Sequence, residues 1–196
     1  LIEGGAFWWG NRCEVTPDMQ YIFVVGAGIE EGIEAVPGGN GCTLNLGQIR
    51  PRSRGEVRLA SNDPAAFPRI VPRYFSDPYD LETVTDGGML AMEIMEQAPI
   101  SRYIERRHVP SGKAISRAEF RAFCQRDAHA ALHPSGTCRM GSDEMAVVDP
   151  ELRVRGVEGL RAAGASIMPT LISGNPNAVC IMIGEKVSDQ IRRHRR

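Results

Sequence analysis

The strongest constraint on the fold of this chain comes from one stretch, residues 133–183. It contains three short sequence motifs, here called phrases, in this order: His-Pro-Ser-Gly-Thr-Cys-Arg-Met-Gly from position 133, Ala-Ala-Gly-Ala-Ser from position 162 and Asn-Pro-Asn from position 175. A residue that precedes proline is pushed away from helical backbone angles, so we expect His133 to be extended. Gly136 and Gly141 indicate tight turns or close backbone approach. The stretch therefore predicts an imidazole that is held in one direction.

The Asn-Pro-Asn phrase predicts the start of a helix. Asn175 is expected at the N-cap and Pro176 at the first helical position, where these residue types are favoured. A fixed imidazole beside the positive end of a helix suits proton removal, because negative charge that develops nearby is stabilised. Four apolar residues recur at helical spacing and predict one buried face: Val179, Ile183, Val187 and Ile191.

These phrases resemble the C-terminal part of the glucose-methanol-choline (GMC) family of FAD-dependent oxidoreductases, and within it the choline dehydrogenase-like branch. The Val-Val-Asp at 147–149 and the Ile-Met-Ile-Gly-Glu-Lys at 181–186 belong to the same resemblance. Several phrases in the right order and at similar spacing make the resemblance specific. Weaker similarity runs through residues 46–59 and 76–80, so the resemblance covers nearly the whole chain.

The resemblance implies an α+β fold. Residues 1–130 would form most of a substrate-binding domain, an antiparallel sheet backed by helices. Residues 131–196 would return as a strand and a helix to an FAD-binding α/β domain. The nucleotide-binding half of that domain belongs to the N-terminal part of the family and is absent from this sequence. We therefore expect a C-terminal portion whose partners are the missing N-terminal FAD-binding portion and a small alcohol substrate.

The resemblance also implies a chemistry, the FAD-dependent oxidation of an alcohol to a carbonyl, with the hydride passing to flavin N5. His133 fills the position of the catalytic base. Asn175 fills the partner position, where its amide can hydrogen-bond the substrate oxygen. Four further residues are implied at the cofactor: Gly164, Ala165, Pro176 and Asn177.

One position departs from the family phrase. The family usually carries Asp where this sequence has Gly164, so an acceptor for the polar chain of the cofactor is lost. The backbone N–H groups of Gly164 and Ala165 could still contribute. The alternative is a non-catalytic remnant that cannot hold FAD alone, and we expect the isolated 196 residues to be inactive. A serine hydrolase is not indicated, because Ser135 and Ser166 lack the Gly-x-Ser-x-Gly turn.

Several strands and loops are predicted from local patterns. Met19–Val25 is rich in β-formers and predicts a strand, whereas residues 1–18 are expected to be irregular. The glycines of Gly-Ala-Gly at 26–28 resemble a dinucleotide loop, but position 31 is Glu rather than the required third glycine, so a loop over 26–42 is favoured. Further short strands are predicted within 50–60, 152–154 and 160–163.

Two helices are predicted upstream of His133. Asp77 at the N-cap and Pro78 at the first position open a helix that Pro99 is expected to end. Ser116 and Glu119 have the spacing of a capping box and open the second helix.

The composition argues against several other classes of protein. The hydrophobic fraction of 42%, the charged fraction of 24% and the net charge of −1 are ordinary for a globular protein and do not favour nucleic acid. Five cysteines without a Cys-x-x-Cys pair argue against a zinc site or a disulfide framework. They suit a reducing compartment, so we expect a cytoplasmic protein, at most peripheral to a membrane. The alcohol is not specified: the rings of residues 7–9 could enclose a quaternary ammonium, although a core position is favoured.

Overall fold

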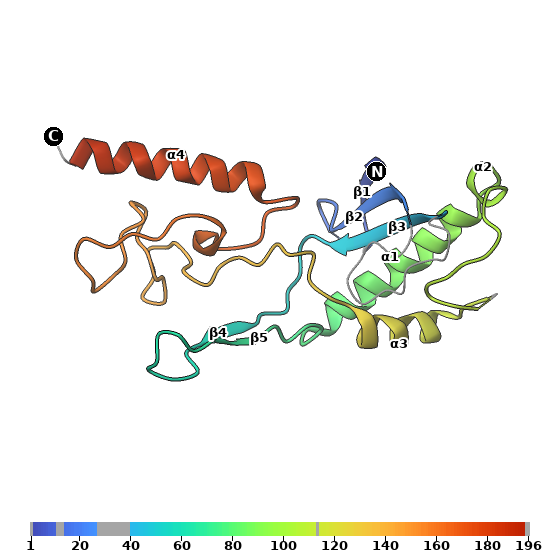
Figure 1. Ribbon diagram of the computed structural model, residues 1–196, viewed down its shortest axis with the longest axis horizontal. Helices are drawn as coiled ribbons and strands as arrows, with labels where there is room; N and C mark the ends of the chain where they lie inside the picture. Colours follow the sequence, from blue (N-terminus) through green and yellow to red (C-terminus); the bar gives the residue numbers. More distant parts are fainter. Residues whose placement is uncertain (1, 11–13, 27–39, 113, 195–196) are drawn as a thin grey trace. The chain divides into compact units, whose positions relative to one another are not determined.

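The computed structural model describes residues 2–10, 14–26, 40–112 and 114–194 of the 196-residue chain (Figure 1). Its helices and antiparallel strands form the predicted α+β class. The chain divides into a sheet unit, Leu1–Arg54 with Arg73–His129, and a C-terminal unit, Gly55–Pro72 with Ala130–Arg196. Residues 55–72 thus group with the C-terminal residues, whereas the sequence prediction kept them in the first domain. The roles of the two predicted domains stay predictions.

The sheet unit contains three antiparallel strands in the order β1-β2-β3 (Figure 1). They are β1 (Ile2–Trp8), β2 (Met19–Val25) and β3 (Cys42–Gln48). The predicted bounds of β2 are confirmed, but the prediction of irregular structure over residues 1–18 is wrong for residues 2–8, which form β1. Pairing with β2 begins where Trp8 lies opposite Met19 and holds β1 in place despite Gly4 and Gly5, which weaken a strand locally.

The aromatic residues of β1 do not join the core. Phe7 is 50% exposed and Trp8 is 44% exposed, so the favoured expectation of a core position is wrong for both. The Trp8 ring lies edge-on to Trp9, with 5.6 Å between the ring centroids. The loop predicted over 26–42 falls largely outside the described residues and stays a prediction.

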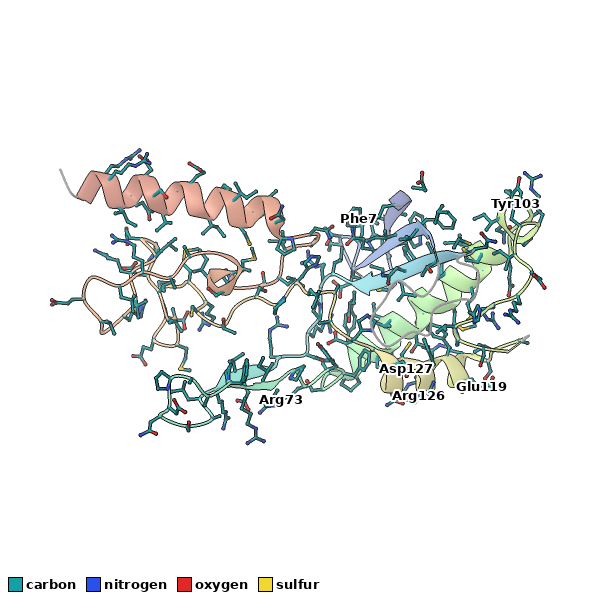
Figure 2. The ribbon with its side chains drawn as sticks, in the orientation of Figure 1. Phe7, Arg73, Tyr103, Glu119, Arg126 and Asp127 are labelled. Carbon is teal, nitrogen blue, oxygen red and sulfur yellow. The ribbon has the colours of Figure 1, made fainter. Side chains whose placement is uncertain are left out.

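Three helices complete the sheet unit: α1 (Pro78–Glu96), α2 (Ala98–Ser101) and α3 (Arg117–Asp127). The Asp77 N-cap and the capping box between Ser116 and Glu119 are both confirmed. Figure 2 shows Glu119 and Arg126 toward opposite ends of α3, an arrangement that complements the helix dipole. Pro99 does not end α1, because the chain leaves the helix after Glu96 and Pro99 lies within α2.

Two adjacent glycines let α1 approach both of its neighbours. A Cβ at Gly87 would come within 2.8 Å of the Met19 side chain on β2, and the Gly87 carbonyl accepts a hydrogen bond from the Tyr21 hydroxyl at 3.0 Å. A Cβ at Gly88 would overlap the Phe120 ring on α3. Glycine inside a helix costs about 1 kcal/mol relative to alanine. Here it allows the sheet and α3 to pack closely on the two sides of α1.

Polar contacts fix the start of α1 and its contact with α3. The buried carboxylate of Asp80 accepts hydrogen bonds from the backbone N–H groups of Arg52 and Ser53 at 2.8 and 2.7 Å, so it anchors the chain that follows β3. On the surface, Arg117 of α3 donates to Glu82 of α1 at 2.6 Å. Hydrogen bonds from Arg117 and then from Arg121 hold the pKa of Glu82 below its usual range.

The C-terminal unit contains β4 (Glu56–Arg58), β5 (Arg69–Val71), the 3-10 helix η1 (Ala165–Ile167) and α4 (Asn177–His194). The predicted buried face of α4 is confirmed, because Ile183 and Val187 belong to a core cluster against which Val179 and Ile191 pack. The segments predicted as strands at 152–154 and 160–163 form isolated bridges instead, Val148 with Val154 and Arg153 with Arg161.

We expect Gly88→Ala to destabilise the sheet unit. A methyl group that overlaps a buried ring costs about 1–3 kcal/mol, which outweighs the gain of about 1 kcal/mol in helix propensity. Gly184→Ala in α4 is the matched control, because a Cβ there meets no described atom within 4 Å, and it should be stabilising. Denaturant unfolding of both variants measures the difference. Equal effects of the same sign would contradict the packing role of Gly88.

Candidate active site

Backbone hydrogen bonds hold the first phrase against the second. The N–H groups of Gly136, Cys138 and Met140 donate to three successive carbonyls, those of residues 165–167, at 3.2, 2.8 and 2.8 Å. On its other side, Met140 forms a parallel bridge with Val148. Residues 136–140, which follow His133, are therefore held by backbone pairing, whereas the direction of the His133 imidazole itself stays a prediction.

Two arginines clamp the turn at the end of the first phrase. Both terminal nitrogens of Arg139 donate to the Asp143 carboxylate, at 2.8 and 2.5 Å. This interaction lowers the pKa of Asp143 to about 2. Arg155 donates to the backbone carbonyls of Asp143 and Gly141 at 2.8 and 2.9 Å. The sequence analysis assigned these side chains no role, although an arginine and an aspartate four residues apart around a glycine indicate such a clamp.

His133 itself is half-buried and lies three residues before the first of these hydrogen bonds. The residue before it, Leu132, has a φ of 57°, in the left-handed region that residues with a Cβ rarely adopt. Leu132 is 85% exposed, so burial of its own side chain does not offset a cost of about 1–3 kcal/mol. The strained turn at Leu132 sets the direction in which the chain enters His133, and nothing in the sequence pattern predicted it.

Gly164 precedes η1 and has a backbone conformation that favours glycine. Its φ is 105° and its ψ is −162°. A Cβ at this position would meet no described atom within 4 Å, so space is not the restriction, but the φ value is one that L-residues rarely adopt. The carbonyl of its neighbour Ala165 accepts the hydrogen bond from the Gly136 N–H. Ala165 therefore belongs to the row of backbone hydrogen bonds between residues 136–140 and 165–167, here called the backbone ladder. The glycine that departs from the family phrase is therefore matched to the local backbone.

The start of α4 differs from the prediction by one residue. The helix begins at Asn177, and the Pro176 carbonyl accepts from the Cys180 N–H at 2.9 Å, as the residue at the N-cap does. Pro176 therefore occupies the N-cap, and Asn175, which was predicted there, lies one residue before it. Asn175 and Asn177 are exposed, and Pro176 is buried.

The positive end of α4 is not neutralised by its own side chains. The first turn of the helix carries no acidic residue. The first N–H groups of any α-helix have no partner within the helix, so this 18-residue helix directs positive potential away from its N-terminus. Such an end fits a negatively charged or electron-rich group, and in this respect the residues fit one edge of a flavin.

One core joins the three phrases of the C-terminal unit. The buried residues Val148, Ile167, Met168 and Ile183 form its centre. Residues from each phrase or from the helix that follows it pack against this centre: Met140, Ala162, Ala165, Val179 and Cys180.

One hollow in the described part of the chain lies apart from the predicted site residues. A hollow of about 500 Å³ is lined by Asp149 and residues 153–161, and none of the predicted site residues lines it. Among the described residues, no three His, Cys, Asp or Glu side chains gather as metal ligands. No helix in the described part of the chain is both long enough and apolar enough to cross a bilayer.

Comparison with known sequences defines the class of protein to which these features belong. Residues 51–184 match the sequence model of the family described as GMC oxidoreductase. The chain belongs to this family, and it corresponds to the C-terminal portion of a choline dehydrogenase-like member.

Particular relatives support this. The chain is 44% identical over 191 residues to the oxygen-dependent choline dehydrogenase of Klebsiella pneumoniae subsp. pneumoniae, a match that covers 97% of this chain and 34% of that protein. It is 42% identical, with the same coverage, to the protein of the same name from Escherichia coli O6:K15:H31. The chain thus spans about a third of the length of these relatives.

Solved structures share the fold. Pyridoxine 4-oxidase from Mesorbium loti superimposes with a TM-score of 0.87 at 30% identity, covering 98% of this chain and 38% of that one. A formate oxidase of Aspergillus oryzae RIB40 gives a TM-score of 0.85 at 26% identity, covering 92% of this chain and 32% of that one.

We expect Gly164→Asp to destabilise the C-terminal unit and not to restore a useful acceptor. The φ of 105° disfavours any side chain, and forcing a residue with a Cβ into such a conformation costs about 1–3 kcal/mol. Gly174→Asp is the control, because no positive φ is recorded there and a Cβ meets no described atom within 4 Å. Thermal unfolding of both variants decides the question. If Gly164→Asp unfolds like the wild type, glycine is not required at this backbone position.

Proposed function

We propose that this chain is the C-terminal portion of an enzyme that oxidises the CH–OH group of an alcohol to a carbonyl with FAD as cofactor. The observation that carries the proposal is the backbone ladder between residues 136–140 and 165–167. It holds the segment after His133 against the segment of Gly164, in the unit whose core α4 completes. A base and a cofactor-binding segment that must work together are best supported by one rigid backbone framework.

In this proposal His133 removes the hydroxyl proton of the alcohol. A neutral imidazole ring nitrogen accepts that proton as the C–H bond is broken, which is the assistance a general base provides. The fixed segment after Pro134 and the strained turn at Leu132 support the role, since both limit the directions His133 can take. FAD, when bound, supplies the acceptor for the hydride.

Asn175 would donate its side-chain N–H to the substrate oxygen as negative charge develops there. Asn175 is exposed and lies two residues before the start of α4 at Asn177, next to the positive end of that helix. Gly164 and Ala165, with Pro176 and Asn177 at the positive end of α4, would surround the flavin ring. The missing N-terminal portion would hold the rest of the cofactor, as nucleotide folds do at a helix N-terminus.

The names of the relatives indicate which class of alcohol the enzyme would oxidise. The names of the sequence relatives specify choline, and that of one structural relative specifies pyridoxine. Both compounds carry a primary alcohol, so we propose a primary alcohol as the substrate class.

We expect His133→Ala to slow reduction of the flavin by the alcohol by roughly 10²–10⁴-fold in the full-length enzyme, the usual contribution of general acid–base catalysis. His129→Ala is the matched control, because His129 is exposed and lies in the sheet unit, and it should react at the wild-type rate. Stopped-flow absorbance at the flavin bands measures both. A wild-type rate in His133→Ala with FAD bound would remove His133 from the role of base.

We expect the isolated 196 residues to bind FAD negligibly and to show no alcohol-dependent turnover, because the proposed nucleotide fold lies outside them. Quenching of FAD fluorescence by added protein tests binding. Reduction of an artificial electron acceptor with choline or simple primary alcohols tests turnover. Saturable micromolar binding, with turnover that His133→Ala abolishes, would show instead that this chain is a complete catalytic unit.

A further inference from the structure

The β4–β5 hairpin, residues 55–72, has one apolar face that the described residues do not cover. Its three cross-strand pairs place Val57 opposite Ile70 on one face and Arg58 opposite Arg69 on the other. Val57 is 49% exposed and Ile70 is 66% exposed. Leu59 and Phe67, which flank the two strands, are 87% and 92% exposed. Four large apolar side chains are therefore open on one short element.

A hairpin this short requires another element to pack against it. Two strands of three residues are at best marginally stable in water without a third strand or a covering layer. The base of the hairpin is nevertheless closely built, because a Cβ at Gly55 would come within 2.5 Å of the Val71 carbonyl oxygen. An element that is closely built at its base and apolar on its open face fits a buried position in a larger assembly.

We propose that this face is the docking surface for the upstream portion of a GMC polypeptide, the two thirds of the relatives' length that this chain does not span. The proposal rests on the proposed function in one respect: it takes this chain to be the C-terminal portion of a longer enzyme. The hairpin belongs to the same compact unit as His133 and Gly164. Packing against it would connect that unit directly to the upstream portion.

The charges of the hairpin favour a protein partner over a lipid surface. Residues 55–72 contain two arginines and two carboxylates, so their formal charges cancel and do not attract anionic headgroups. The connection between the strands carries Ser61, Asn62 and Asp63, all exposed, and Asp63 accepts a hydrogen bond from the Ala65 N–H at 2.9 Å. A polar tip of this kind would have to enter the bilayer first if the hairpin inserted.

The test compares thermal unfolding in two contexts: the isolated chain, and a chimaera in which these residues replace the matched third of the Klebsiella choline dehydrogenase. The triple variant Val57→Thr, Phe67→Ser, Ile70→Thr keeps β-branched residues in both strands. We expect it to lower the Tm of the chimaera by roughly 5 °C and to leave the isolated chain unchanged. Tyr103→Ser is the control: Tyr103 is 77% exposed, lies after α2 (Figure 2), and should affect neither protein.

Several results would overturn the proposal. Equal Tm values for the wild-type and triple-variant chimaeras would show that the face stays open, and an equal loss in both contexts would show a role within this chain. A wild-type chimaera that does not fold would also count against complementarity between this face and the upstream portion. Light scattering that detects a dimer lost in the triple variant would identify a second copy as the occupant, and flotation with anionic vesicles would identify a membrane. Unfolding does not depend on turnover, so these results are independent of the role of His133.

Discussion

The C-terminal unit depends on the backbone hydrogen bonds between residues 136–140 and 165–167. An N–H group that lost its carbonyl partner without gaining water would cost about 1–3 kcal/mol, so these segments, 27–29 residues apart in the chain, cannot separate locally without a penalty. The ladder also explains why the clamp at Arg139 and the positive φ of Gly164 lie where they do: both shape the ends of the paired segments. Loss of this pairing would disconnect His133 from the proposed flavin-binding segment without altering either side chain.

The sheet unit is held by a different constraint, the close approach of α1 to its neighbours. Gly87 and Gly88 have low helix propensity, but the absence of a side chain lets β2 and α3 pack closely on the helix. Asp80 accepts hydrogen bonds from two backbone N–H groups of the chain after β3. The surface ion pairs of Arg117 and Arg121 with Glu82 add little by comparison, because exposed pairs typically contribute less than about 1 kcal/mol. Packing and buried hydrogen bonds therefore determine this unit.

Local patterns predicted elements whose signals are short-range. The Asp77 cap, the capping box at Ser116, the bounds of β2 and the apolar face of α4 depend on residues within a few positions of one another, and all were predicted correctly. The strand β1 was missed because its stability comes from pairing with β2, not from its own glycine-containing sequence. The start of α4 was misplaced by one residue, since Asn and Pro can each occupy neighbouring positions at a helix start.

The amino-acid sequence alone identified the family and the α+β class, and it supplied the residues to which the proposed chemistry is assigned, because phrases such as His-Pro-Ser-Gly and Asn-Pro-Asn are specific in composition and spacing. Local patterns did not reveal the backbone conformations of Leu132 and Gly164, the buried role of Asp80 or the exposure of the β4–β5 hairpin, which became known from the folded structure. These properties arise from contacts between segments distant in the chain. A positive φ or a buried carboxylate is held in place by such partners, and no local pattern records which partners will meet.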